Sequence, residues 1–133
     1  MDSNEINRLF SEQKLAELLP ANIADDFFEA LYGSSNDGAY DISLSFRDVD
    51  PVRKTLEFEF VLRQRAGKCL GCSLTFGLPQ VFSRHPVINV KGIVERIGRL
   101  LDGKGTCTDW TLGRTKIVSG DLHIIPLSIS YSE

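Results

Sequence analysis

Cys69 and Cys72 form a C-x-x-C pattern, which in other proteins holds a metal ion or forms a redox disulfide. A structural zinc ion needs four ligands, which strong sites supply as a second cysteine pair or as closely spaced histidines. The other candidate ligands, Cys107, His85 and His123, each stand alone in the sequence. Redox C-x-x-C pairs work best at a helix N-terminus, whereas this pair opens a segment with strand-like alternation. The pattern favours structural cysteines and no cofactor, with a metal- or thiol-dependent protein as the second hypothesis.

The two histidines are the natural candidates for acid–base chemistry, because unperturbed histidine titrates near neutral pH. His85 stands between Arg84 and Pro86, a position typical of a cap or a turn. Asp121 and His123 have the spacing of one strand face, but Asp121 fits a turn better. The sequence has no G-x-S-x-G elbow and no serine or cysteine flanked by signals of a general base. It therefore predicts no catalytic residue and favours a protein that is not an enzyme.

Charge is distributed unevenly along the chain. Residues 1–60 contain thirteen acids and five bases, whereas residues 61–116 contain ten bases and three acids. Such an asymmetry can steer an anionic partner or a second copy of the same chain. A pI near 5.4, with Glu95 and Asp102 inside the basic segment, makes nucleic acid an unlikely partner. The candidate binding residues are Arg84, His85, Lys91, Arg96, Arg99 and Trp110.

The elements that must position these residues are indicated by the spacing of apolar side chains. A period near 3.6 predicts three helices, and a period of 2 predicts five strands. The predicted helices cover residues 2–19 with a break near Ser11, residues 22–31 with Asn22 as a cap and Gly33 as the stop, and a segment between 86 and 103. The predicted strands cover residues 42–47, 56–63, 70–76, 108–118 and 122–131.

These elements predict one α+β domain over residues 1–133, in the order ααβββαββ. The first three strands are expected to form an antiparallel meander. A five-stranded, mainly antiparallel sheet with the helices on one face buries every apolar stripe. The order of the strands within the sheet is left open.

The sequence also predicts a cytoplasmic protein without a membrane partner. The longest nearly uncharged stretch, residues 69–83, is broken by glycine and proline and is too short to span a bilayer. The first residues are acidic, unlike the basic start of a secretory signal. Three cysteines cannot form a closed set of disulfides, which fits a reducing compartment.

Residues 38–42, 68–89 and 107–110 resemble a small family of uncharacterised bacterial proteins. Some members of that family carry the label "pancreas/duodenum homeobox protein", and the resemblance implies no known activity. A homeodomain consists of three helices with a basic reading helix, whereas five segments of this chain alternate like strands. We therefore do not expect homeobox function.

The predicted order of elements is also similar to that of the dimeric chaperones of bacterial type III secretion. Those proteins end with a further helix that is not predicted here, and a likeness of topology implies no function. The leading hypothesis is a non-enzymatic binding or interaction domain, including a homodimer, that recognises a protein partner or its own copy. A secretion-chaperone-like protein is kept as an alternative on topology alone.

Overall fold

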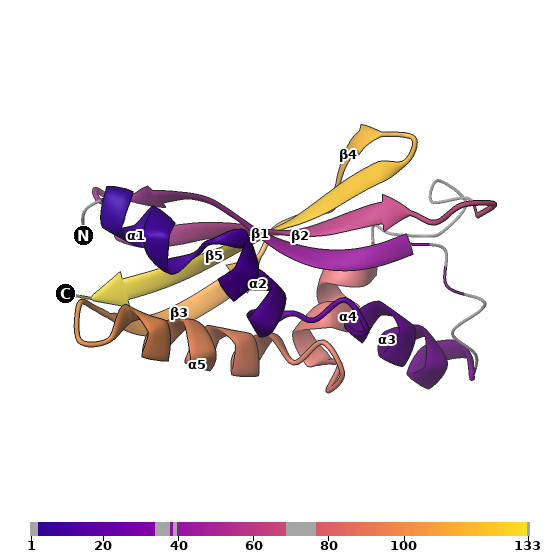
Figure 1. Cartoon of the computed structure of the whole chain (residues 1–133), viewed down its shortest axis with the longest axis horizontal. Coiled ribbons are helices and arrows are strands. Elements are labelled where there is room, and N and C mark those ends of the chain that lie inside the picture. The colour runs from indigo at the N-terminus through magenta and orange to yellow at the C-terminus, as the bar shows by residue number, and fades with distance from the viewer. Residues whose placement is uncertain (1–2, 34–37, 39, 69–76, 133) are drawn as a thin grey trace.

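The computed structural model of the chain describes residues 3–33, 38, 40–68 and 77–132. Five antiparallel strands form a sheet, and the helices pack on one side of it (Figure 1). The predicted α+β class is therefore confirmed. The elements are α1 Ser3–Leu9, α2 Glu12–Leu18, α3 Ile23–Tyr32, β1 Tyr40–Asp50, β2 Thr55–Gln64, α4 Leu78–Arg84, α5 Val90–Leu101, β3 Thr106–Leu112, β4 Lys116–Ser119 and β5 Leu122–Ser132.

The strand order is β1-β2-β5-β3, with β4 also paired to β5. β2 pairs with β5 from Leu122 to Ser130. β3 pairs with residues 127–132 of β5, and β4 pairs with residues 122–124. Since β2 occupies one side of β5, β3 and β4 must lie end to end along its other side. The sheet thus has two edges, one formed by β1 and the other by β3 and β4.

The core lies between the sheet and the helices. Every second residue of β2 from Leu56 to Leu62 is fully buried, whereas the residues between them are half-buried. Phe58 contacts Phe10 edge to face, with 5.0 Å between the ring centroids. This alternation follows from the period of a strand whose two faces meet different environments. None of the described helices is both long and apolar enough to cross a membrane.

Two of the three predicted helix signals are confirmed. Ser11 separates α1 from α2 and caps α2, since its hydroxyl accepts a hydrogen bond from the Lys14 N–H over 3.4 Å. Gly33 ends α3 in the left-handed conformation, with φ of 81°. Asn22 occupies the predicted N-cap position of α3, but its side chain makes no capping hydrogen bond and instead donates to the Asp26 carboxylate over 3.0 Å.

The element order differs from the predicted one, because the described elements run αααββααβββ. The predicted strand 70–76 lies outside the described residues. The predicted meander is wrong, because the second neighbour of β2 is β5. The predicted strand 108–118 is interrupted between β3 and β4 at Gly113. A Cβ at Gly113 would lie 3.2 Å from the ring of Pro126, and the Gly113 N–H donates to the Pro126 carbonyl over 2.8 Å.

Helix α4 was not predicted, since Gly77 and Pro79 indicated only the end of a strand. Pro79 lies in the first turn of α4, where its missing N–H removes no helical hydrogen bond. Phe82 of α4 is fully buried, with its ring centroid 5.5 Å from that of Phe27 and 5.4 Å from that of Phe60. These contacts with distant residues stabilise the segment as a helix.

Candidate functional site

Helix α5 carries the basic residues that the sequence singled out. Its buried side consists of Val90, Ile93, Val94, Ile97 and Leu101. Asn89 precedes the helix with φ of 51°, and its side chain accepts a hydrogen bond from the Gly92 N–H over 3.2 Å. This cap and the apolar stripe fix the rotation of α5, so that its polar residues face away from the sheet.

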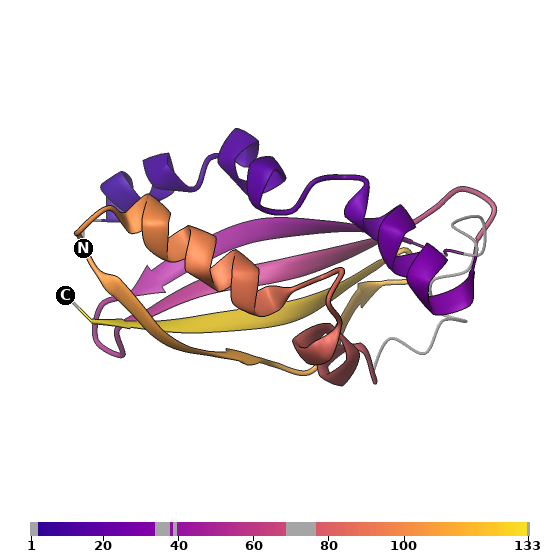
Figure 2. The same cartoon turned by 90° about the horizontal axis from the view of Figure 1, so that it is seen from below.

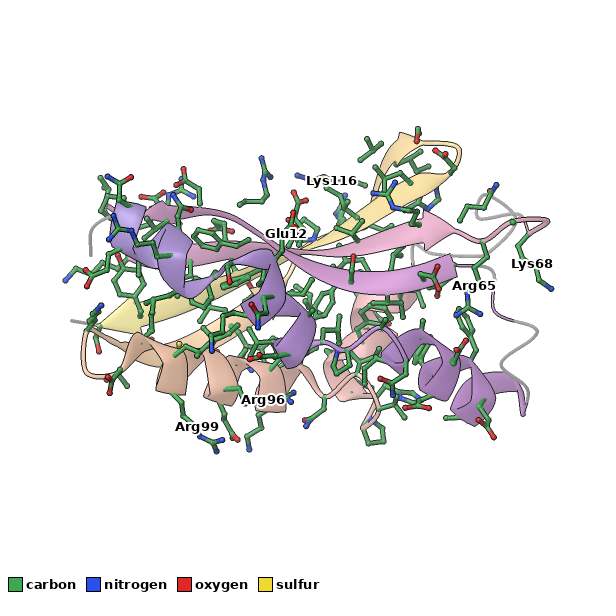
Figure 3. The ribbon with its side chains drawn as sticks, in the orientation of Figure 1. Glu12, Arg65, Lys68, Arg96, Arg99 and Lys116 are labelled. Carbon is green, nitrogen blue, oxygen red and sulfur yellow. The ribbon has the colours of Figure 1, made fainter. Side chains whose placement is uncertain are left out.

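Arg96 and Arg99 project side by side from α5, away from the sheet (Figure 3). Together with residues of α2 they enclose a hollow of about 250 Å³. We call this site the basic hollow, and its lining residues are Lys14, Glu17, Leu18, Arg96, Arg99 and Leu100. Three cations and one acid give it a net charge of +2, while two leucines form its apolar part.

The cations of the basic hollow are weakly neutralised. Lys14 pairs with Glu17 over 3.7 Å, but both side chains are about half exposed or more, and such pairs stabilise by only about 0–1 kcal/mol. Arg96 donates from Nε to the Gly92 carbonyl over 3.2 Å, which orients its guanidinium. Within the described residues, Arg99 makes no side-chain hydrogen bond or ion pair. The hollow therefore offers guanidinium donors to an added anion.

The structure separates the other predicted basic residues from this hollow. Lys91 is exposed in the first turn of α5 and does not line it. Arg84 and His85 lie together at the end of α4, along a different, shallower depression. His85 accepts a hydrogen bond at Nδ1 from the Val87 N–H over 3.2 Å, and its ring contacts that of Phe27 edge to face at 4.9 Å. These contacts give His85 a structural role at the end of the helix.

Trp110 belongs to the packing of the sheet and not to a basic surface. It is half-buried in β3 and pairs with Ile129 of β5, which is fully buried under the helices. Residues paired across antiparallel strands point to the same side of the sheet. The indole therefore packs against the core from β3, whereas Arg96 and Arg99 are on α5.

The candidates for metal or thiol chemistry are not assembled in the described part of the chain. Cys69 and Cys72 lie outside the described residues. Cys107 is half-buried on β3, and this burial raises the pKa of its thiol. His123 is buried on β5 opposite Leu62. Within the described ranges, no three His, Cys, Asp or Glu side chains are grouped as metal ligands.

A larger hollow lies between α2 and β1 and has a volume of about 640 Å³. Its charged lining residues are Glu12, Asp41 and Arg63. Asp41 already accepts a hydrogen bond from Arg65 over 3.0 Å. Most of the other residues that line this hollow have small or apolar side chains. Its size exceeds that of the basic hollow, but its charges are of mixed sign and partly paired. We therefore place the candidate site at the basic hollow.

Sequence reasoning found Arg96 and Arg99 but missed the half of the site on α2. Lys14 follows the Ser11 break and stands four residues before Leu18, which is the spacing of neighbours on one helix side. That spacing predicts a mixed basic and apolar patch on α2, but not that α2 lies beside α5. No family model, curated protein or solved structure matches the chain.

Proposed function

We propose that the chain is a non-enzymatic interaction domain that binds an acidic segment of a protein partner at the basic hollow. One observation carries the proposal. Arg99 has no acidic partner among the described residues and stands beside Arg96, next to the apolar surface of Leu18 and Leu100. Leaving a guanidinium without a partner contributes nothing to folding, whereas it supports binding of a carboxylate.

The shape and lining of the hollow suit a carboxylate with an apolar neighbour. Arginine presents a planar fork of donors that matches a carboxylate in a two-point contact. Leu18 and Leu100 can pack against an apolar side chain next to that carboxylate. A volume of about 250 Å³ accommodates one or two side chains and not a folded surface. A segment in which glutamate or aspartate alternates with leucine or a similar residue fits this lining best.

Nucleic acid fits the same lining less well. Single-stranded nucleic acid is held by a long cationic groove together with aromatic side chains that stack on the bases. Here Glu17 of α2 lines the hollow, and Glu95 lies on α5, the helix of Arg96 and Arg99. Trp110, which could stack on a base, packs against the core. A strand brings several phosphates to the hollow, and those near these acids are repelled, whereas a single carboxylate can avoid them.

Calorimetric titration with a blocked peptide of alternating glutamate and leucine tests the proposal. We expect Arg99→Glu to raise the dissociation constant at least about tenfold, because about 1.4 kcal/mol of attraction becomes repulsion. Lys91→Glu is the matched control, since it makes the same charge change on the same helix outside the hollow. Equal losses in the two variants would contradict the site.

The same titration with a single-stranded oligonucleotide separates the two classes of partner. We expect the peptide to bind and the oligonucleotide to bind more weakly, with a gentle salt dependence for the peptide. Tighter binding of the oligonucleotide, with an affinity that falls steeply with salt, would overturn the proposal in favour of nucleic acid. Absence of peptide binding at every salt concentration would overturn it as well.

A further inference from the structure

A further hollow lies between α5 and the start of β3, whereas the basic hollow lies between α5 and α2 (Figure 2). Its volume is about 480 Å³, almost twice that of the basic hollow. Arg99 lines both hollows, so the two meet at this residue. We call the second one the glycine hollow, because its lining includes Gly98, Gly103 and Gly105. Arg99 thus has a hollow on each side of it.

Gly98 is the residue of α5 that opens this hollow. Glycine inside a helix is less stable than alanine, because it loses more backbone freedom on folding. A Cβ added at Gly98 would have Cys107 as its nearest neighbour, with 3.8 Å to Sγ, which is an ordinary van der Waals contact. Gly98 is also not among the glycines with a positive φ. Alanine would therefore fit here, and neither the backbone nor the packing requires glycine.

Gly92 of the same helix is different, because the structure does require glycine there. A Cβ at Gly92 would overlap the side chain of Asn89, which caps α5 by accepting a hydrogen bond from the Gly92 N–H. Gly98 takes part in no cap of this kind, and its effect on the structure is to leave the glycine hollow open. A residue that weakens its own helix without helping the fold is typical of a functional site.

The lining of the glycine hollow suits an uncharged side chain. Its charged lining residues are Glu95 and Arg99, whose charges cancel, whereas the basic hollow has a net charge of +2. Glu95 would repel a second carboxylate at this place. Val94 and Cys107 supply apolar surface, and burial raises the pKa of the Cys107 thiol, so this group is uncharged at neutral pH. An apolar side chain is therefore the occupant that the lining favours.

We propose that the glycine hollow binds a second apolar side chain of the same acidic segment, an inference that rests on the function proposed for the basic hollow. The carboxylate of the segment contacts Arg99, where the two hollows meet. One apolar side chain packs against Leu18 and Leu100 in the basic hollow, and the other lies over Gly98. Opposite charge fixes the centre of the segment, and the two hollows select an apolar residue on each side of the acid.

Three blocked peptides test the second apolar contact. One has a leucine on each side of a central glutamate, and in each of the other two a serine replaces one of the leucines. We expect the two-leucine peptide to bind at least about tenfold more tightly than either one-leucine peptide in calorimetric titration, because burial of one leucine side chain gives a factor of this order. Equal affinities for the three peptides would overturn the inference.

Filling the glycine hollow locates this contact. Gly98→Leu places a side chain in the hollow, so the two-leucine peptide should lose its advantage, while at least one of the one-leucine peptides binds as it does to wild type. Gly98→Ala is the matched control, because its methyl group fits and leaves most of the volume free. It should keep the preference and melt at a higher temperature. A preference that survives Gly98→Leu would overturn the assignment to this hollow.

A surface substitution tests the same hollow without filling it. Glu95 is exposed on α5, so Glu95→Lys should leave the fold intact and turn the glycine hollow cationic. A peptide in which a second glutamate replaces one leucine should then gain at least about fivefold relative to the matching serine peptide, which measures the general effect of the added charge. An equal gain for both peptides would place the second side chain outside this hollow and overturn the inference.

These outcomes separate the second contact from the proposed function. One-leucine peptides that bind wild type and lose affinity with Arg99→Glu support the basic hollow by itself. If the second leucine then adds nothing, only the role of the glycine hollow fails. If none of the three peptides binds, the function proposed for the basic hollow fails, and the second contact fails with it.

Discussion

The two edges of the sheet are protected in different ways. α1, α2 and α3 follow one another along the β1 edge (Figure 2), so that edge is covered by helices. At the opposite edge, α5 packs against β3, but no described helix makes comparable contact with β4. The β1 edge is thus protected by packing, whereas β4 is protected by its short length, a lysine and a bulge. Packing closes an edge to every partner, while polar protection leaves it open to a matching one.

Contacts between side chains hold the N-terminal helices on the β1 edge. Phe10 lies 5.2 Å from Phe46 of β1 between ring centroids. Arg65 links α3 to β1, since it contacts Asp25 at 2.7 Å and Asp41 at 3.0 Å. β4 has no equivalent of either contact in the described part of the structure. Substitutions at the two edges should therefore differ in effect, with a large loss of stability at β1 and a small one at β4.

The largest expected effect is the loss of the aromatic contact at the β1 edge. Phe10→Ala should lower the free energy of unfolding by about 3–5 kcal/mol, because it leaves a cavity between α1 and the sheet. Val118→Ala on β4 should change it by less than about 0.5 kcal/mol. Urea denaturation followed by circular dichroism measures both values. Similar values for the two variants would remove the contrast between the edges.

A smaller effect is expected at the charged link between α3 and β1. Arg65→Ala should lower the free energy of unfolding by about 1–2 kcal/mol, because the arginine is mostly covered while its acidic partners are exposed. Arg63→Ala, at an exposed position of β2, is the control. Part of the loss should vanish in high salt, which screens exposed charges. A variant as stable as wild type would show that packing alone closes this edge.

The smallest expected effect concerns the turn beside β4. Ser119→Ala removes the hydroxyl donor, so the pKa of Asp121 should rise toward its ordinary value of 3.8. A lowered pKa stabilises the folded state above the ordinary value, and this contribution is lost as pH falls through the lowered one. Carboxyl chemical shifts followed by NMR over an acid titration measure the change. An unchanged titration would assign the shift to the other groups around Asp121.

Local patterns predicted the parts of the fold that depend on neighbours in sequence. The break at Ser11 and the end of α3 at Gly33 follow from capping chemistry within a few residues. The alternation from Leu56 to Leu62 follows from the geometry of a strand with one buried face. Arg96 and Arg99 were found because their spacing on one helix side can be recognised without knowing what that side meets.

Long-range packing decided the rest. Placement of β5 beside β2 depends on pairs such as Phe60 with Ile125, which are far apart in the sequence. Helix α4 forms where Phe82 meets Phe27 and Phe60, against the local signals of glycine and proline. The free energy of these contacts comes from residues far apart in the sequence, so local patterns could not predict the elements that depend on it.

By itself, then, the sequence determined the periods, the caps and the charges of this protein, because these arise from interactions within a turn or two of the chain. Only the tertiary structure decided that α2 lies beside α5, which completes the basic hollow around Arg99. It also decided that β4 is left at an open edge with Ile117 and Val118 exposed. Both features depend on which apolar surfaces bury one another, and this packing is a cooperative property of the whole core and not of any one segment.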